Sequence, residues 1–275
     1  MAFNPLGQAT EYKTQYDPAL LYPIARAESR NGLGIASDSL PFFGVDVWTG
    51  YELSWLDESG KPQVAVAEFF IPCSSEFIVE SKSFKLYLNS FNQTRLASVD
   101  EMSHRLAQDL SQVTRAEVRV MVYPLGDSSS PLATIAQPLG TCIDEINTEI
   151  NEYSPNKNLL RVEKTEEVVE ECLYSHLLKT NCPVTGQPDW ATLIINYHGK
   201  KIDQESLLKF VVSYREHQDF HEHCVESIYM AIKEVCNPEQ LSVVARYTRR
   251  GGLDINPLRS SSIEFSSETI RLVRQ

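Results

Sequence analysis

The segment from residue 181 to residue 192 reads NCPVTGQPDWAT and places a cysteine and an aspartate at the two ends of a stiff turn. The prolines and glycine between them predict that Cys182 lies at the end of a strand, where the backbone can present a side chain into a cleft. A nucleophilic cysteine reacts as its thiolate and needs a nearby group that handles protons, which Asp189 could be. Their spacing alone suggests, but does not establish, that Cys182 and Asp189 act together in catalysis. A free cysteine is more often buried and inert, and an aspartate before a strand is often a turn residue or cap.

A second group of reactive side chains stands in the segment DFHEHC, residues 219–224, at the start of an expected helix. A zinc interpretation is invited by His221, Glu222, His223 and Cys224. A structural site needs a second cysteine pair at short separation, which Cys182 alone does not supply. A catalytic metal site from Cys182, His221 and Cys224 stays conceivable. For Glu222 the plain alternative is a carboxylate that complements the helix dipole.

Cys224 lies one helical turn after His221, so it could approach Cys182 when the site is empty. An activated thiolate is easily oxidised, and a neighbouring cysteine can trap its sulfenic acid as a disulfide. Cys224 is therefore a candidate resolving cysteine for Cys182. The alternative is a small apolar residue packed beside Val225.

Two basic segments stand out in an acidic chain. ESKSFKLY, residues 80–87, places Lys82 and Lys85 one turn apart at an expected helix start, which would suit an anion, although an exposed amphipathic helix explains it equally. ARYTRRGG, residues 245–252, follows two arginines with two glycines that would let the backbone approach a phosphate. An ordinary polar turn is the alternative. NGLGIAS, residues 31–37, follows no strand and is not a dinucleotide loop.

The elements that must position these groups recur in two halves. The first reads strand, strand, helix, helix, strand over residues 42–124, with a capping box at Ser98 and Glu101. After a segment rich in serine, proline and glycine, the same order returns. The pattern predicts an α+β fold built from a duplicated unit, with helices on one face of antiparallel sheets and pairing between halves or subunits. We expect modules at 1–125 and 156–275, with a poorly ordered connector at 126–155 that holds one short strand.

Composition restricts the setting. The net charge of -12 argues against a nucleic-acid partner, and no apolar run is long enough to span a bilayer. No secretory signal is visible, and the six cysteines are scattered singly, which favours a reducing cytoplasm.

Three of these segments together carry a family resemblance. ESKSFKLY in the first half, with CPVTGQPDWA and FHEHC in the second, resembles the two-module QueF family of queuosine-pathway nitrile reductases. The resemblance covers nearly the whole chain, the motif combination is highly specific, and no motif position departs from the pattern. It implies tandem tunnelling-fold (T-fold) modules, a homodimer, and NADPH-dependent reduction of 7-cyano-7-deazaguanine to the aminomethyl compound without a metal.

The resemblance also implies roles for particular residues. Cys182 matches the family's nucleophile and Asp189 its proton donor. The substrate-contacting positions are Val79, Glu80, Ser81, His221 and Glu222. The NADPH-contacting positions are Ser81, Lys82, Arg250 and Gly251. Since the Cys182 motif and the ESKSFKLY motif occur once each in different halves, one complete site needs both modules, within a chain or across a dimer.

Other classes of function stay open at this point. One is a zinc-dependent, cyclohydrolase-like T-fold enzyme. Another is a thiol hydrolase that converts a nitrile to an acid, although its usual glutamate and lysine partners have no clear motif here. A non-catalytic binding module explains Cys182 with Asp189 least well.

Overall fold

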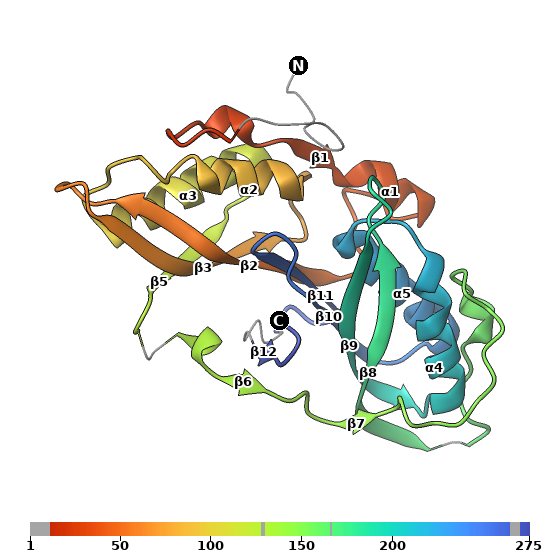
Figure 1. Cartoon of the computed structure of the whole chain (residues 1–275). Coiled ribbons are helices and arrows are strands. Elements are labelled where there is room, and N and C mark those ends of the chain that lie inside the picture. Colours follow the sequence, from red (N-terminus) through yellow and green to blue (C-terminus); the bar gives the residue numbers. More distant parts are fainter. Residues whose placement is uncertain (1–11, 128–129, 166, 265–269) are drawn as a thin grey trace.

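The computed structural model describes residues 12–127, 130–165, 167–264 and 270–275. Its centre is an eight-stranded sheet (Figure 1). In spatial order the strands are β5 (Arg119–Pro124), β3 (Pro62–Pro72), β2 (Phe43–Leu56), β11 (Leu253–Ser260), β10 (Gln240–Tyr247), β9 (Pro188–Lys200), β8 (Val168–Asn181) and β7 (Thr141–Cys142). All neighbours are antiparallel except β7 and β8. The predicted mixed α+β class is confirmed.

The two halves meet in the middle of this sheet. β11, near the end of the chain, pairs with β2 from the first half over eight residues, from Leu253 opposite Gly50 to Ser260 opposite Phe43. The expected pairing between halves therefore fuses their strands into one continuous sheet.

The helices cover one face of the sheet (Figure 1). α2 (Ser81–Asn89) and α3 (Val99–Thr114) lie over the strands of the first half, and α4 (Gln204–Ser213) and α5 (His221–Cys236) over those of the second. The short α1 (Arg26–Gly32) precedes β2. Ser98 caps α3 as predicted, because its hydroxyl accepts the Glu101 N–H at 3.1 Å.

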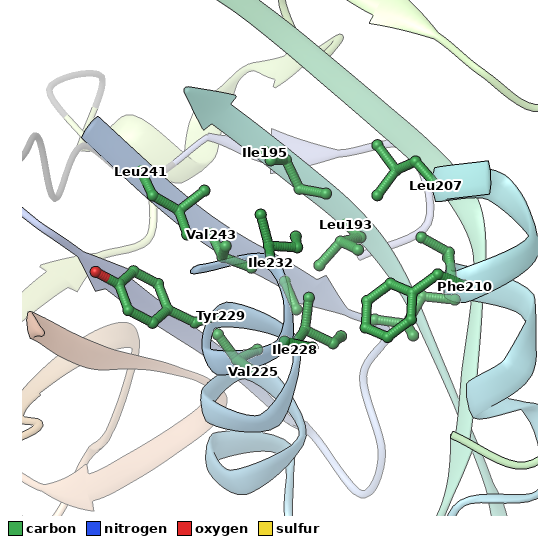
Figure 2. Packing of buried hydrophobic residues seen from close by; sticks show 14 of the residues in the cluster. Leu193, Ile195, Leu207, Phe210, Val225, Ile228, Tyr229, Ile232, Leu241 and Val243 are labelled. Carbon is green, nitrogen blue, oxygen red and sulfur yellow. The ribbon is translucent and has the colours of Figure 1, made fainter. Parts of the chain in front are cut away.

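Each half has its own apolar core between helices and strands. In the second half, an apolar stripe on α5 packs against β9 and β10 (Figure 2). Val225, Ile228, Tyr229 and Ile232 of this stripe are fully buried. In the first half Met102, Leu106 and Leu110 of α3 are buried in the corresponding position. This helical periodicity of apolar residues fixes the helix rotation and so aims the first turn of α5.

The connector is more ordered than expected. Beyond a 3₁₀ turn at Pro131–Ala133, its described residues hold two short strands, not one: β6 (Ile135–Ala136), which pairs with β12 (Arg271–Leu272), and β7, which pairs with β8. Further 3₁₀ turns lie at Pro18–Leu20, Lys157–Leu159 and Tyr214–Glu216. Among the described residues, none of the helices is long and apolar enough to cross a membrane.

The helix-free face of the sheet carries a cavity of about 560 Å³. Its lining residues come mainly from β8, β9, β10 and β11 and include none of the predicted site residues. The candidate chemistry lies on the other face.

Candidate active site

A narrow pocket of about 30 Å³ lies on the helix-covered face where the two halves meet. Trp48 of β2 and Ile255 of β11, which are register partners, line it. The other lining residues are Ile78, Val79, Glu80, Ser81, Cys182, Pro183, Asp189, Asp219, Phe220, His221, Glu222 and Arg250. The fold thus brings the first-half and second-half motifs to one place within a single chain.

The hairpin between β8 and β9 fixes Cys182 relative to Asp189. β8 ends at Asn181, as expected, and Asp189 lies opposite Thr180 in the register. Within the turn, the Cys182 N–H donates to the Gln187 carbonyl at 2.8 Å, and the Gly186 N–H donates to the Cys182 carbonyl at 3.0 Å. Both the cysteine and the aspartate are only 6% exposed. The stiff turn therefore holds both side chains in the pocket wall.

The environment of Cys182 favours its thiolate. Burial opposes the charge, but the Thr185 hydroxyl, the N–H groups of Thr185 and Val184, and the Arg250 guanidinium together lower the pKa of the thiol below its ordinary value. A lowered pKa increases the thiolate fraction near neutral pH, which a nucleophilic cysteine requires.

Asp189 has a cationic or proton-bearing group close to each carboxylate oxygen. His221 Nε2 lies 3.4 Å from Oδ2, and Arg250 Nη1 lies 3.1 Å from Oδ1. The His221 ring stacks on buried Tyr247 of β10 with ring centres 3.7 Å apart and planes 2° apart. This stacking holds the edge of the imidazole ring toward Asp189, so the imidazole and the carboxylate lie close enough to pass a proton.

Glu222 presents an acceptor to the pocket. Its side chain is 2% exposed in the first turn of α5, and burial raises the pKa of the carboxyl. Among the described residues, nothing donates a hydrogen bond to its Oε1. A buried acceptor without a partner is costly and points to a missing ligand group.

Three further polar atoms of the pocket are unsatisfied in the same way. Within the described part of the chain, Trp48 Nε1, His221 Nδ1 and Arg250 Nη1 are buried and lack a hydrogen-bond partner. Arg250 and Asp189 are therefore close enough to form an ion pair, but the geometry at Nη1 does not satisfy a hydrogen bond. Three nitrogens and one carboxylate oxygen concentrated in one small pocket are suited to a flat, polar heterocycle.

The first-half residues reach the pocket through a small second sheet. β1 (Pro23–Ala25) pairs with β4 (Phe77–Val79), and the Glu80 N–H donates to the Tyr22 carbonyl at 2.9 Å. The Glu80 carboxylate caps α2 by accepting the N–H groups of Lys82 and Ser83, both at 2.7 Å. Burial nevertheless raises the pKa of Glu80.

This cap corrects one of the sequence interpretations. An anion cannot use the first amides of α2, because the Glu80 carboxylate already accepts two of them. Lys85 is engaged as well, since its Nζ lies 2.9 Å from a Glu52 oxygen and also donates to the Gly251 carbonyl.

The Arg250 side chain is carried by a tight hairpin between β10 and β11. Arg250 N–H donates to the Leu253 carbonyl at 2.8 Å, and Gly251 and Gly252 between them have φ of 62° and 79°. Two successive positive φ values are what a two-residue type I′ turn requires, which explains the Gly-Gly pair. Arg249 is directed elsewhere, because its Nη2 donates to the Gln275 carbonyl at 2.8 Å.

The predicted NADPH positions are only partly at the pocket. Ser81 and Arg250 line it, whereas Lys82 and Gly251 are their chain neighbours and do not. Arg250 is 34% exposed and stands beside glycine backbone, so this hairpin fits the phosphate-bearing part of a dinucleotide. The cofactor assignments stay predictions.

Cys224 is fully buried in the second-half core, and burial raises the pKa of its thiol to about 12. Cys182 and Cys224 are both free thiols. These observations favour the packing interpretation of Cys224 over the resolving cysteine, which stays untested as a solution property.

The zinc interpretation of the site is also weakened. Among the described residues, the group of potential ligands close enough to share one metal ion is Cys142, Asp144 and His176. It contains neither Cys182 nor His221.

Sequence reasoning missed several pocket residues, namely Trp48, Ile78, Pro183, Asp219, Phe220 and Ile255, together with Tyr247 beneath His221. Asp219 and Phe220 belong to the DFHEHC segment and Pro183 follows Cys182, so proximity in the chain could have found them. Trp48 and Ile255 gave no such signal, because only the pairing of β2 with β11 brings them together.

Comparison with known proteins decides the family. Residues 12–122 match the family model "Nitrile reductase, 7-cyano-7-deazaguanine-reductase N-term", and residues 188–264 match the model "QueF-like protein". A protein of Saccharophagus degradans named NADPH-dependent 7-cyano-7-deazaguanine reductase is 57% identical over 261 residues, covering 95% of each chain. The chain belongs to the QueF family.

Other QueF relatives agree. Proteins with the same name from Desulfotalea psychrophila and Ralstonia nicotianae are 53% and 50% identical, covering 98% and 99% of this chain and 97% and 98% of theirs. The crystal structure of the archaeosine synthase QueF-Like in the apo form aligns with a TM-score of 0.31 at 20% identity, over 36% of this chain and 99% of that one. That likeness is too distant to carry an argument. The family expected from the three motifs is confirmed.

Proposed function

We propose that this chain reduces the nitrile of 7-cyano-7-deazaguanine to the aminomethyl group with NADPH. The observation that carries the proposal is the single pocket lined by Cys182, Asp189 and Glu222, in a chain whose full-length relatives are named for this reaction. The product belongs to queuosine biosynthesis, a tRNA modification.

The first step is addition of sulfur to the nitrile carbon. The Cys182 thiolate forms the S–C bond, and the C≡N triple bond becomes the C=N bond of a covalent thioimide. Asp189 takes the thiol proton as the thiolate forms and then delivers it to the nitrogen, which gains charge as the sulfur adds. His221 Nε2 and Arg250 Nη1 lie 3.4 Å and 3.1 Å from the two oxygens of this carboxylate.

NADPH supplies two hydrides, one per molecule. After the first hydride reaches the thioimide carbon, the C–S bond breaks, Cys182 leaves as thiolate, and an imine remains. The second hydride and a further proton give the primary amine, so two NADPH and two protons convert C≡N to CH₂NH₂. The narrow pocket of about 30 Å³ supports a site that shields the imine from water.

Recognition of the base rests on the unsatisfied atoms. The Glu222 carboxylate would accept the adjacent N–H donors of the guanine-like edge. His221 would contact the substrate beside it, and Val79, Glu80 and Ser81 would contribute contacts from the first half. We add Trp48 to this set, because its indole N–H is buried at the pocket without a partner among the described residues and would suit the ring carbonyl.

We place NADPH at Ser81, Lys82, Arg250 and Gly251. Arg250 supports this assignment, being charged and partly exposed on a glycine hairpin.

At the level of the molecule, we propose that residues 1–125 and 156–275 are T-fold modules joined by a connector at 126–155, and that the protein is a cytoplasmic homodimer without a nucleic-acid partner. The uncovered face of the sheet supports an assembly of this kind.

One experiment tests the reaction. Protein is mixed with 7-cyano-7-deazaguanine, and NADPH absorbance and the amine product are followed. We expect two NADPH consumed per amine formed. Without NADPH, the intact mass should increase by one substrate, and Cys182→Ala should abolish both the adduct and turnover. Release of ammonia without NADPH consumption would instead identify a nitrile hydrolase, and no reaction with the nitrile would reject the proposal.

A further inference from the structure

A second group of reactive side chains lies outside the pocket, where the connector meets β8. One ligand-type atom each from Cys142, Asp144 and His176 lies within 4.8 Å of the other two, and all three residues are half-buried. None of them lines the Cys182 pocket. His176 is five residues before the end of β8, or about 16 Å along the strand.

The pairing of β7 with β8 and an irregularity in β8 bring these three residues together. Cys142 of β7 lies opposite Tyr174 of β8, and Asp144 follows two residues later. The register of β8 against β9 shifts between Ser175 and Leu178, so His176 sits in a β-bulge. Bulges redirect side chains that a regular strand would point elsewhere, and here the shift places His176 beside the connector.

Hydrogen bonds from Ser175, Thr192 and the His176 backbone hold two of the three side chains in place. Asp144 accepts the Ser175 hydroxyl at 2.6 Å, and its other oxygen accepts the His176 N–H at 2.9 Å. His176 Nδ1 lies 2.8 Å from the Thr192 hydroxyl of β9. Metal-binding histidines usually have their second ring nitrogen fixed in this way, with the other nitrogen left for the ion.

We propose that Cys142, Asp144 and His176 form a Zn²⁺ site. Sulfur, imidazole nitrogen and carboxylate oxygen suit zinc, whereas magnesium and calcium prefer oxygen alone. In a tetrahedral zinc site neighbouring ligand atoms are about 3.4 Å apart, so the group, whose atoms lie within 4.8 Å of one another, closes by at most about 1.4 Å around the ion. Binding takes the proton from the Cys142 thiol, and a water molecule occupies the fourth position.

The site acts as a cross-link. Two of its ligands belong to the connector and the third to the sheet, and β7, the neighbouring contact between them, is only two residues long. Arg274 near the chain end also donates to the His176 carbonyl at 2.9 Å. An ion bound here fastens the connector to β8, and because it binds the folded chain it stabilises that chain.

The test uses the full chain, reduced, stripped with EDTA and titrated with Co²⁺ as a spectroscopic substitute for Zn²⁺. We expect one equivalent to give a thiolate-to-cobalt charge-transfer band that Zn²⁺ then removes. Cys142→Ser should abolish the band. Cys172→Ser is the matched control, because Cys172 lies on β8, the strand that carries His176, and its thiol donates to the Leu139 carbonyl outside the group. Thr192→Val should weaken metal affinity about 10–100-fold.

Two further variants separate the possible failures. In Cys182→Ala the band should persist, so the result does not depend on the proposed nitrile chemistry, and Zn²⁺ should raise the Tm of this variant as it does for the wild type. If Cys142→Ser fails to fold by circular dichroism, His176→Gln decides by the same titration. A wild-type chain without the band, or a folded Cys142→Ser or His176→Gln variant with the full band and wild-type affinity, overturns the proposal.

Discussion

At Cys182, opposing influences on one thiol set its reactivity. Burial raises the free energy of the charged form. The Thr185 hydroxyl, nearby N–H groups and Arg250 together lower it by more than burial raises it, so the pKa falls below its ordinary value. The hairpin supplies most of these donors from residues directly after the cysteine. The turn that fixes the geometry therefore also activates the nucleophile.

Thr185→Val should raise the pKa of Cys182, because it removes the hydroxyl that stabilises the thiolate. Since the thiolate is the nucleophile, adduct formation should speed up with pH and level off above the pKa. The variant's profile should therefore shift to higher pH while its plateau stays similar. Stopped-flow adduct formation over a pH series measures this shift. Thr185→Ser keeps the hydroxyl and should keep the wild-type profile; a shift of equal size in both variants would contradict the assignment.

Glu222→Gln should weaken binding of the nitrile substrate, because a neutral amide replaces the buried charged acceptor. A hydrogen bond to a charged group is worth about 1.5–3 kcal/mol, so the Kd should rise roughly tenfold to a hundredfold. Calorimetry in the Cys182→Ala background measures binding without covalent capture. Glu234→Gln on the same helix, where the exposed carboxylate pairs with Lys157, is the control and should change nothing. Equal affinity in all three proteins would remove Glu222 from the substrate contacts.

At the scale of elements, the Gly251–Gly252 hairpin determines where Arg250 points. A Cβ at Gly252 would lie 2.5 Å from the Glu52 Cδ, and φ there is +79°. Gly252→Ala should therefore cost about 1–2 kcal/mol of backbone strain, displace Glu52 from Lys85 and move Arg250. We expect a raised KM for NADPH. Gly34→Ala has a similar φ of +69° but open space around it, so it should lose similar stability with unchanged kinetics. An unchanged KM in Gly252→Ala would contradict the positioning role.

Much of this element structure could be predicted from sequence. The Ser98 capping box predicted where α3 begins, and the Pro-Gly-Pro turn predicted that Cys182 ends a strand. Such features depend on local periodicity and turn chemistry. One short strand was predicted in the connector and two are present, because two-residue strands form only where β8 and β12 already offer backbone partners.

The site was predicted through motifs, and its remaining walls depend on tertiary pairing. Trp48 reaches the pocket because β2 meets β11 more than two hundred residues away in the chain. The use of Glu80 as the cap of α2 likewise makes two of the first helix amides unavailable to an anion, which the sequence of this segment does not reveal. Sequence spacing identifies the residue types, and the fold decides which of their hydrogen bonds remain available.

At the scale of the whole molecule, a buried charge network joins the two halves. Asp46 of β2 contacts Arg26 at 2.5 Å and Arg259 of β11 at 2.7 Å. Glu226 of α5 contacts the same Arg259 at 2.8 Å and Arg30 of α1 at 2.6 Å. Each of the five side chains is at most 3% exposed. Because buried charges are stable only when paired, the network stabilises one arrangement of the halves around the pocket.

Glu226→Gln should destabilise the protein by about 3–5 kcal/mol at neutral pH, because it leaves Arg30 and Arg259 without their buried counter-charge. Despite burial, the two guanidinium groups lower the pKa of Glu226 from 4.5 to about 2. Its stabilisation is therefore complete above pH 4.5 and is lost as the pH falls toward 2. Urea unfolding across this range should show a steep fall in the free energy of unfolding for the wild type and a shallower fall for Glu226→Gln.

The control is Glu76→Gln, which removes the exposed partner of Arg115 and should cost at most about 1 kcal/mol of stability. Parallel pH profiles in the wild type and Glu226→Gln would show that the network does not control acid stability.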